Sequence, residues 1–167
     1  FLSLFVSNSQ NNDINIERFI SYTDLVEEFK ESINNNEDFN LSNCLIYYDN
    51  QSTDSIYFSE QSAYSIFLEI NEDLFFDKDV YFTNCFFNEP VTFKNFHFKN
   101  LKITDTQNLK LNKIVAENVE FFQSTCDISD SNINYLTLYG YDENGETKGW
   151  NVIENNNINC VKVSDFN

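Results

Sequence analysis

The feature that most constrains the fold is a five-residue spacing of apolar side chains between Val80 and Leu138. Within each run an apolar residue recurs at every fifth position, and the step lengthens to six, eight or seven between runs. This first column consists of Phe82, Phe87, Phe93, Phe98, Ile103, Leu111, Ala116, Phe121, Ile128, Ile133 and Leu138. A helix repeats every 3.6 residues and a lone strand every two, so neither explains the spacing. The pattern predicts a solenoid, in which short extended segments turn a corner every few residues.

A second column of apolar or small residues precedes the first by two positions. It consists of Val80, Cys85, Val91, Phe96, Leu101, Leu109, Ile114, Val119, Cys126, Ser131 and Leu136. The residues between the columns are mostly Asn, Asp, Lys, Thr and Ser. We therefore expect both columns to point into the core and the polar residues to face solvent.

The composition agrees with a coiled β architecture. The chain has only 3 Gly and 1 Pro, whereas a sandwich or barrel with many tight turns usually contains more of both. It has 27 Asn, a residue that tolerates left-handed backbone and bonds its own backbone at corners. With 167 residues, 41% of them hydrophobic, it can bury the core of a single domain spanning 1–167.

The regular part resembles the pentapeptide-repeat family, mainly over residues 80–138. Cys126-Asp127-Ile128-Ser129-Asp130 and Ser131-Asn132-Ile133-Asn134-Tyr135 match the family pattern of a small residue, Asp or Asn, a large apolar residue and two polar residues. Segments 80–84, 85–89, 91–95 and 96–100 match it in a bulkier form. The resemblance implies a mostly β fold, a right-handed parallel β-helix of four-sided coils.

Three features depart from that pattern. The spacing slips at Pro90, at Thr104–Asn108 and at Phe122–Thr125. In addition, Phe96 and Leu101 are large for the tight corner of the family. Wider or three-sided coils therefore remain an alternative.

An amphipathic helix is expected before the coils. Tyr22, Leu25, Val26, Phe29 and Ile33 follow the helical i, i+3, i+4, i+7 pattern. Ser21 is a suitable N-cap with Asp24 at N3, and Asn34–Asn36 ends the helix. Strands are expected at Phe1–Val6 and Ile14–Ile20. Because a solenoid needs its open end covered, we assign residues 1–38 to an N-terminal cap. The polar face of the helix, either a solvated face or a binding surface, carries Asp24, Glu27, Glu28 and Glu31.

The β-helix is assigned to residues 39–138. The apolar pairs appear in rough form over Phe39–Ile46 and resume over Ile56–Leu68. Residues 71–79 are expected to form an acidic outward bulge around a buried Leu74-Phe75-Phe76.

Residues 139–167 are expected to hold a C-terminal β-hairpin and the last strands. Asn144-Gly145 is a strong two-residue hairpin signal, with Trp150 packing beside Tyr139 or Tyr141. Ile158–Val163 is predicted to form a last strand pair or one more rung of the solenoid.

The sequence offers no catalytic signature, so we expect no enzyme and no cofactor. The single His, His97, falls between two inward Phe residues and should point outward as a surface residue. None of Cys44, Cys85, Cys126 and Cys160 has a metal-site spacing. Asp142-x-Asn144-x-Glu146 lacks the twelve-residue calcium loop.

The cysteines and the distribution of apolar residues predict a cytoplasmic protein, located in the host cell if it is phage-encoded. Thiols in a core fit a reducing compartment. No apolar run approaches the ~18 residues of a membrane helix, and the short apolar start is interpreted as a strand rather than a signal peptide.

The net charge is −17 and is unevenly distributed. Residues 1–38 carry −6, residues 39–93 carry −8 and residues 114–167 carry −7, whereas residues 94–113 carry +4. The positive segment holds Lys94, Lys99, Lys102, Lys110 and Lys113. An acidic body repels nucleic acid and anionic membranes and attracts basic proteins.

This charge suggests nucleic-acid mimicry. If residues 39–163, with 18 acids and 8 bases, stack into about six coils, the rod carries one net charge per ~3 Å, within about twofold of duplex DNA. Some pentapeptide-repeat proteins do act as duplex mimics, which is what the resemblance implies. We therefore expect an inhibitor of a basic nucleic-acid-handling enzyme such as a nuclease, as a phage anti-defence inhibitor or an antitoxin or immunity protein. The expected partner-binding residues are Glu69, Glu72, Asp73, Asp77, Asp79, Glu117, Glu120, Asp127, Asp130, Asp142, Glu143 and Glu146.

Two other functions remain open at this point. A structural or scaffolding β-solenoid would use its surface for protein interactions without inhibiting anything. A carbohydrate-active β-helix would require a shallow groove lined by aromatic residues and two carboxylates.

Overall fold

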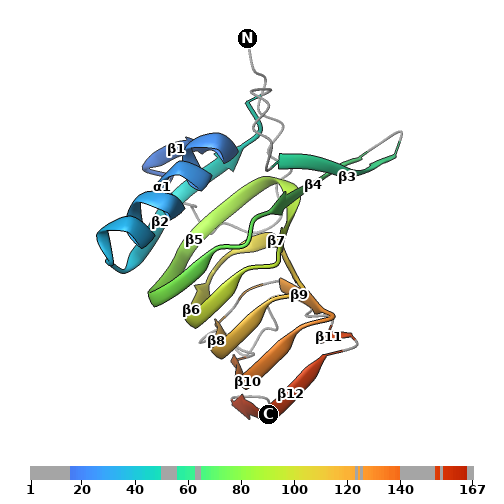
Figure 1. Ribbon diagram of the computed structural model, residues 1–167. Helices are drawn as coiled ribbons and strands as arrows, with labels where there is room; N and C mark the ends of the chain where they lie inside the picture. The colour runs from blue at the N-terminus through green and yellow to red at the C-terminus, as the bar shows by residue number, and fades with distance from the viewer. Residues whose placement is uncertain are drawn as a thin grey trace.

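Parallel strand pairing stacks the chain into coils, as the computed structural model shows for residues 16–49, 56–62, 65–122, 124, 126–139, 153–154 and 156–164 (Figure 1). One helix near the N-terminus, α1 (Tyr22–Asn35), follows the short strand β1 (Arg18–Ser21). The strands after it are β2 (Phe39–Tyr47), β3 (Ile56–Ser62), β4 (Ser65–Asn71), β5 (Phe75–Lys94), β6 (His97–Thr104), β7 (Gln107–Asn112), β8 (Val115–Phe122), β9 (Cys126–Ser129), β10 (Asn132–Tyr139), β11 (Ile153–Glu154) and β12 (Asn157–Ser164).

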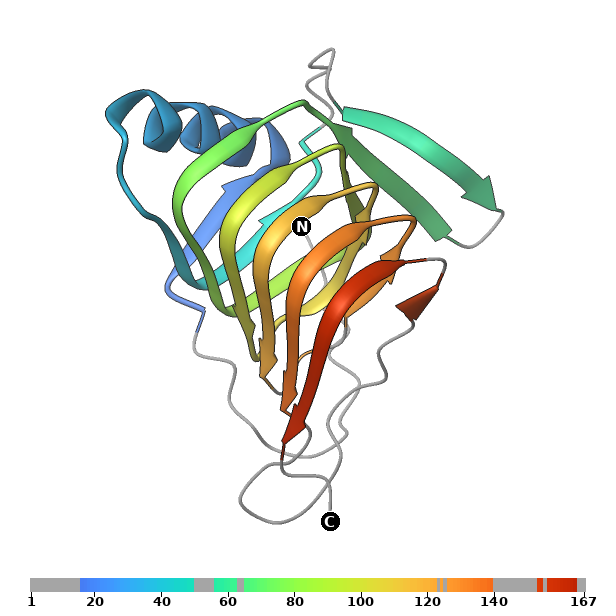
Figure 2. The same cartoon turned by 60° about the horizontal axis from the view of Figure 1, so that its bottom comes forward.

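The strand order confirms the predicted β-solenoid, which has about four turns. The main path runs β11-β9-β7-β5-β6-β8-β10-β12, and every pair along it is parallel. The long strand β5 joins the two branches, because its first half pairs with β6 and its second half with β7. In Figure 2 the strands follow one another as nested arcs.

The coils shorten along the axis. Phe82 aligns with Ile103, 21 residues later, whereas Ile103 aligns with Phe121 after 18 residues and Phe121 with Leu138 after 17. The first of these coils still contains the inward pair Cys85 and Phe87.

In the next coil that pair is replaced by a single inward residue, Thr106. The Cys85 backbone N–H donates to Thr106 Oγ1 at 3.4 Å, and Asn108 Nδ2 donates to the Phe87 carbonyl at 3.0 Å, which places 106–108 beside 85–87. One apolar pair is therefore lost, which explains the eight-residue step between Ile103 and Leu111. The four-sided form does not persist beyond β5, since the coil 96–112 has three inward pairs.

Both predicted columns form the core. All of their members with described side chains are buried, except Leu138, which is partly buried against the core. The side chain of Cys126 lies outside the described residues. Burial of each phenyl ring contributes about 2–3 kcal/mol, so both columns stabilise the coils.

Residues with left-handed backbone conformation lie at the corners of the coils. Among the described residues, eight non-glycine residues have positive φ, and five of them are Asn. Asn43, Asn84 and Asp105 align at one corner, while Asn95, Lys113 and Asp130 align at another. Asn84 Nδ2 also donates to Asn43 Oδ1 across 2.8 Å. The expectation that Asn takes the place of Gly at corners is therefore confirmed.

The helix α1 closes the first coil, as predicted. Ser21 caps it by accepting a hydrogen bond from the Asp24 backbone N–H at 3.1 Å, and Asn36 ends it in the left-handed conformation. Its buried side chains are Tyr22, Leu25, Val26 and Phe29. Figure 1 shows the helix lying over the start of the stack.

Two expectations were wrong. Residues 56–62 do not add a rung, because β3 pairs antiparallel with β4 and only Leu68–Asn71 of β4 stack in parallel on β5. Phe75 is 54% exposed and not buried, since strand alternation turns the middle residue of an apolar triplet away from the core that holds Phe76.

The C-terminal part forms a further rung, one of the two alternatives that the sequence left open. The strand β12 pairs in parallel with β10, and β11 pairs in parallel with β9. The predicted strand Phe1–Val6 and the hairpin at Asn144-Gly145 lie outside the described residues.

Candidate protein-binding surface

Lysines and carboxylates pair across neighbouring coils on the outer surface. Lys94 Nζ lies 3.0 Å from Glu69 Oε1, and Lys110 Nζ lies 3.6 Å from Asp127 Oδ2. Lys102 Nζ approaches Glu120 Oε2 at 3.9 Å. Residues 94–139 contain five acids and five lysines, so this part of the solenoid has no net charge.

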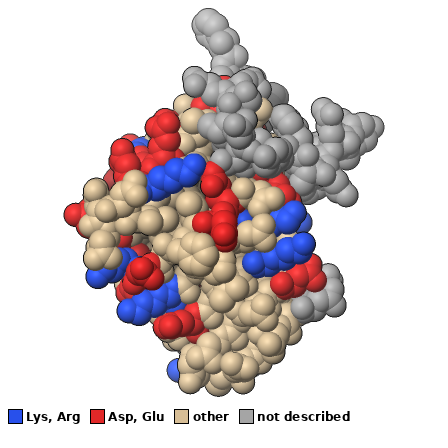
Figure 3. All heavy atoms as spheres, viewed as in Figure 1, with Lys and Arg blue, Asp and Glu red and all other residues tan. Residues whose placement is uncertain are grey.

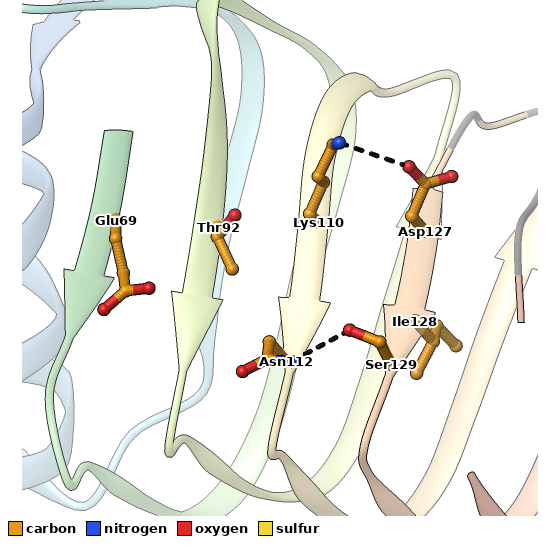
Figure 4. A pocket seen from close by; sticks show the side chains of 7 residues that line it. All are labelled: Glu69, Thr92, Lys110, Asn112, Asp127, Ile128 and Ser129. Carbon is orange, nitrogen blue, oxygen red and sulfur yellow. Dashed lines mark hydrogen bonds and ion pairs between the residues drawn. The ribbon is translucent and has the colours of Figure 1, made fainter. Parts of the chain in front are cut away.

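A shallow hollow of about 360 Å³ lies over β4, β5, β7 and β9 (Figure 4). Its residues come from aligned positions, since Glu69 aligns with Thr92, Thr92 with Lys110 and Lys110 with Asp127. Asn112 Nδ2 donates to Ser129 Oγ at 2.8 Å in the same hollow. Four of the polar groups of this hollow therefore bond in pairs, Lys110 with Asp127 and Asn112 with Ser129.

A second hollow, of about 430 Å³, lies over β5, β6 and β8 and contains two carboxylates and one aromatic ring. Here Asn118 Nδ2 donates to Asn100 Oδ1 at 2.6 Å, and Asn100 Nδ2 donates to Asp79 Oδ1 at 2.6 Å. Tyr81 donates its hydroxyl to Asp79 Oδ2 at 2.9 Å. The hydrogen bond from Asn100, followed by that from Tyr81, lowers the pKa of Asp79 below its ordinary value. Asp79 therefore acts as an ionised hydrogen-bond acceptor that joins side chains on the surface of the coil.

Acids are in excess at the end of the molecule that carries α1. Residues 17–38 contain seven acids and two bases. We define the acidic end by six of its exposed carboxylates, which are Glu27, Glu31, Glu37, Asp38, Asp73 and Asp77. In Figure 3 acidic atoms gather at this end, whereas blue and red alternate over the coils.

The acidic end is held together by contacts between the helix and the first coil. Asp38 Oδ1 accepts a hydrogen bond from the Asp79 backbone N–H at 3.1 Å, and Lys30 Nζ lies 2.9 Å from Glu72 Oε1. Phe76, which precedes Asp77, packs its ring 5.5 Å from that of Phe29. Within the described part of the chain, no ion pair involves Glu27, Glu31, Glu37 or Asp77. These carboxylates are therefore presented on a rigid frame.

The structure distributes the sequence-predicted binding residues over several environments. Four of them, Glu69, Glu72, Glu120 and Asp127, have lysine neighbours. Asp130 accepts from Asn112 at 3.1 Å, Asp79 from Asn100, and Asp73 contacts His97. Asp77 and Glu117 are exposed, whereas Asp142, Glu143 and Glu146 lie outside the described residues.

Sequence reasoning left Glu37 and Asp38 out of the expected contacts and treated the acids of the helix only as an open alternative. The signal that indicates them is the segmental charge of −6 over residues 1–38. The decisive addition is the Asp38–Asp79 hydrogen bond, which joins the helix end to the first coil.

The cysteines with described side chains and the single histidine lie in separate environments. Cys44 and Cys85 are buried free thiols, whereas Cys160 is exposed. Burial raises the pKa of Cys85 to about 12, which keeps this thiol protonated. No cluster of three or more metal-ligating side chains occurs among the described residues. His97 lies at the surface, as predicted, with 31% of its side chain exposed.

Together the fold and the surface define a parallel β-solenoid protein with a helical cap and a strongly acidic end. Comparison with protein-family models, with curated proteins and with solved structures found no match for this chain. In the part of the chain that the structure describes, no helix has the length and apolar character needed to cross a bilayer.

Proposed function

We propose that this protein is a non-enzymatic binding protein whose acidic end docks on a basic surface of a nucleic-acid-handling protein. The observation that supports the proposal most strongly is the division of charge. The coils 94–139 balance their acids with lysines, whereas residues 17–38 carry an excess of five acids over bases. Charge that only served solubility would have no reason to concentrate at one end.

The acidic end has the physical properties of an electrostatic docking surface. The backbone that carries these carboxylates is fixed by the packing of α1 on the first coil, so little backbone freedom remains to be lost on binding. A concentrated field of one sign raises association rates with an oppositely charged partner and suppresses encounters with like-charged ones. Both effects weaken as salt screens the exposed charges.

Inhibition by nucleic-acid mimicry is the role we assign to this surface. A basic groove that binds phosphates also attracts a rigid set of carboxylates, and its occupation excludes nucleic acid. Because residues 94–139 carry no net charge, we limit the mimicry to the acidic end and do not extend it along the rod. An antitoxin or immunity protein of a nuclease and a phage inhibitor acting in the host cytoplasm both fit this role.

A scaffolding solenoid without inhibitory activity is the second candidate. The observation that favours it is the charge-balanced outer surface of the coils, with pairs such as Lys110–Asp127, which resembles an ordinary protein interaction surface. Such a complex would rely on polar and apolar contacts and would resist salt.

A capture experiment with two charge-matched variants tests the proposal. The first carries Glu27→Gln, Glu31→Gln, Asp38→Asn and Asp77→Asn; the control carries Glu117→Gln, Glu120→Gln, Asp127→Asn and Asp130→Asn. Each variant loses four negative charges. We expect the wild type and the control to capture a basic nucleic-acid-handling protein from host lysate, to release it at about 0.5 M salt, and the first variant to lose capture. Equal capture by both variants, or a salt-resistant complex, would refute the acidic end as the docking surface.

A further inference from the structure

An exposed phenyl ring lies within the acidic end. Phe75 is 54% exposed, although its neighbour Phe76 is buried in the core. The ring of Phe75 stacks on the ring of His97, with centroids 4.0 Å apart and planes inclined by 15°. His97 Nε2 in turn lies 3.1 Å from Asp73 Oδ1. One face of the phenyl ring is therefore covered and the ring is held in place before any partner arrives.

Carboxylates flank this ring. Asp77 follows Phe75 by two residues on β5, and the side chains of both are exposed, whereas Phe76 between them is buried. The side chain of Asp73 is 73% exposed. On β8, Val115 aligns with His97 and is 43% exposed, which extends the apolar surface by one more strand.

From this arrangement we infer that Phe75, Asp73 and Asp77 form a site for an arginine side chain of the basic partner; the inference rests on the function proposed above. A guanidinium is planar and weakly hydrated, so it stacks on an aromatic face while its N–H groups bond a carboxylate in bidentate fashion. An ammonium is compact and strongly hydrated, and gains less from the ring. The site therefore selects arginine over lysine at equal charge.

Hexaarginine and hexalysine peptides are suitable probes, because they carry the same charge. We expect the wild-type protein to bind hexaarginine about three-fold more tightly than hexalysine in low-salt calorimetric titrations. Phe75→Leu keeps the apolar character of the site but removes the aromatic face. This variant should lose the preference for arginine while its affinity for hexalysine stays within about two-fold. Tyr135→Leu is the matched control, since Tyr135 is 52% exposed on the distant strand β10, and it should keep the preference.

The outcomes separate this inference from the proposed function. Equal binding of the two peptides by the wild type, or an arginine preference that survives Phe75→Leu, overturns the arginine site and leaves the acidic end as a general basic-partner surface. Binding of both peptides that is unaffected by Glu27→Gln, Glu31→Gln, Asp38→Asn and Asp77→Asn, or no binding at all, overturns the docking surface itself. If Phe75 and Val115 instead bind an apolar partner, the wild type would bind the two peptides equally.

Discussion

The ring of Phe29 on α1 stands at 90° to the ring of Phe93 on β5, with centroids 5.7 Å apart. This edge-to-face contact is one of several that the same ring makes with the first coil. Among the described residues, Phe29 also makes ring contacts with Phe39, Phe76, Phe82 and Phe96. Aromatic pairs contribute about 0.5–1.5 kcal/mol beyond their burial, so this side chain helps to hold the cap on the solenoid.

Truncation of this ring should be strongly destabilising. We expect Phe29→Ala to lower the free energy of unfolding by about 3–5 kcal/mol, because it leaves a cavity between the helix and the first coil. Phe19→Ala is the control, since Phe19 is 67% exposed and its loss should change stability by less than about 0.5 kcal/mol. Urea unfolding measures both values, and similar values for the two variants would contradict the capping role of α1.

A buried hydroxyl links the coils at the position where one side of the solenoid is lost. Thr106 is fully buried, donates to the Thr104 carbonyl at 2.9 Å and accepts from the Cys85 backbone N–H. Thr106→Val keeps the shape but leaves that N–H without its acceptor, which should cost about 1–3 kcal/mol of unfolding free energy. Thr137→Val on the outer surface of β10 should cost under about 0.5 kcal/mol. Equal effects in thermal or urea unfolding would show that the hydroxyl is dispensable.

At the corner formed by Lys113, substitution by glycine should stabilise the protein, whereas glycine within a strand destabilises it. Lys113 has φ of 54°, a conformation that costs a non-glycine residue about 1–2 kcal/mol. Lys113→Gly should therefore raise the free energy of unfolding by up to about 1 kcal/mol, after the greater flexibility of glycine in the unfolded chain is taken into account. Lys99→Gly, within β6, should lower it by about 1 kcal/mol. If Lys113→Gly lowers the free energy of unfolding, the left-handed backbone at this corner is not a source of strain that glycine relieves.

Asp79 should make stability depend on pH in the acid range. Hydrogen bonds from Asn100 and Tyr81 lower its pKa in the folded state, so its contribution is fully present above the ordinary value of 3.8. The contribution is lost as the pH falls through the lower folded pKa. We expect the wild type to be more stable than Asp79→Asn at pH 6 and the difference to narrow below pH 3.8 in urea unfolding. A difference that stays constant with pH would exclude this linkage.

The coils and their cap could be predicted from the sequence because the residues that face the core are apolar and recur at a regular spacing. The residues of the first column face the core from Phe82 to Ile133, and the helical spacing of Tyr22 to Phe29 matches the buried face of α1. The hairpin β3–β4 could not be predicted, since alternating apolar residues suit both an antiparallel pair and a coil. The sequence left wider or three-sided coils open as an alternative, and the loss of one side follows only from how Thr106 stacks beside Cys85.

The surface was harder to predict than the core. Lys110 and Asp127 are 17 residues apart in sequence, and only the register of β7 and β9 shows that they face each other. Because the sequence does not show that register, Asp127 was expected to be free to bind a partner. Conversely, Asp38 joins Asp79 across 41 residues, which sequence spacing does not indicate.

The most direct test of the account is carboxyl-group labelling of the protein, free and bound to its captured basic partner, read residue by residue by mass spectrometry. If the acidic end is the docking surface, Glu27, Glu31, Asp38 and Asp77 lose labelling in the complex, while the exposed carboxylates Glu117 and Asp130 on the coils keep it. Protection centred on Glu117 and Asp130, with the acidic end labelled as in the free protein, would contradict it.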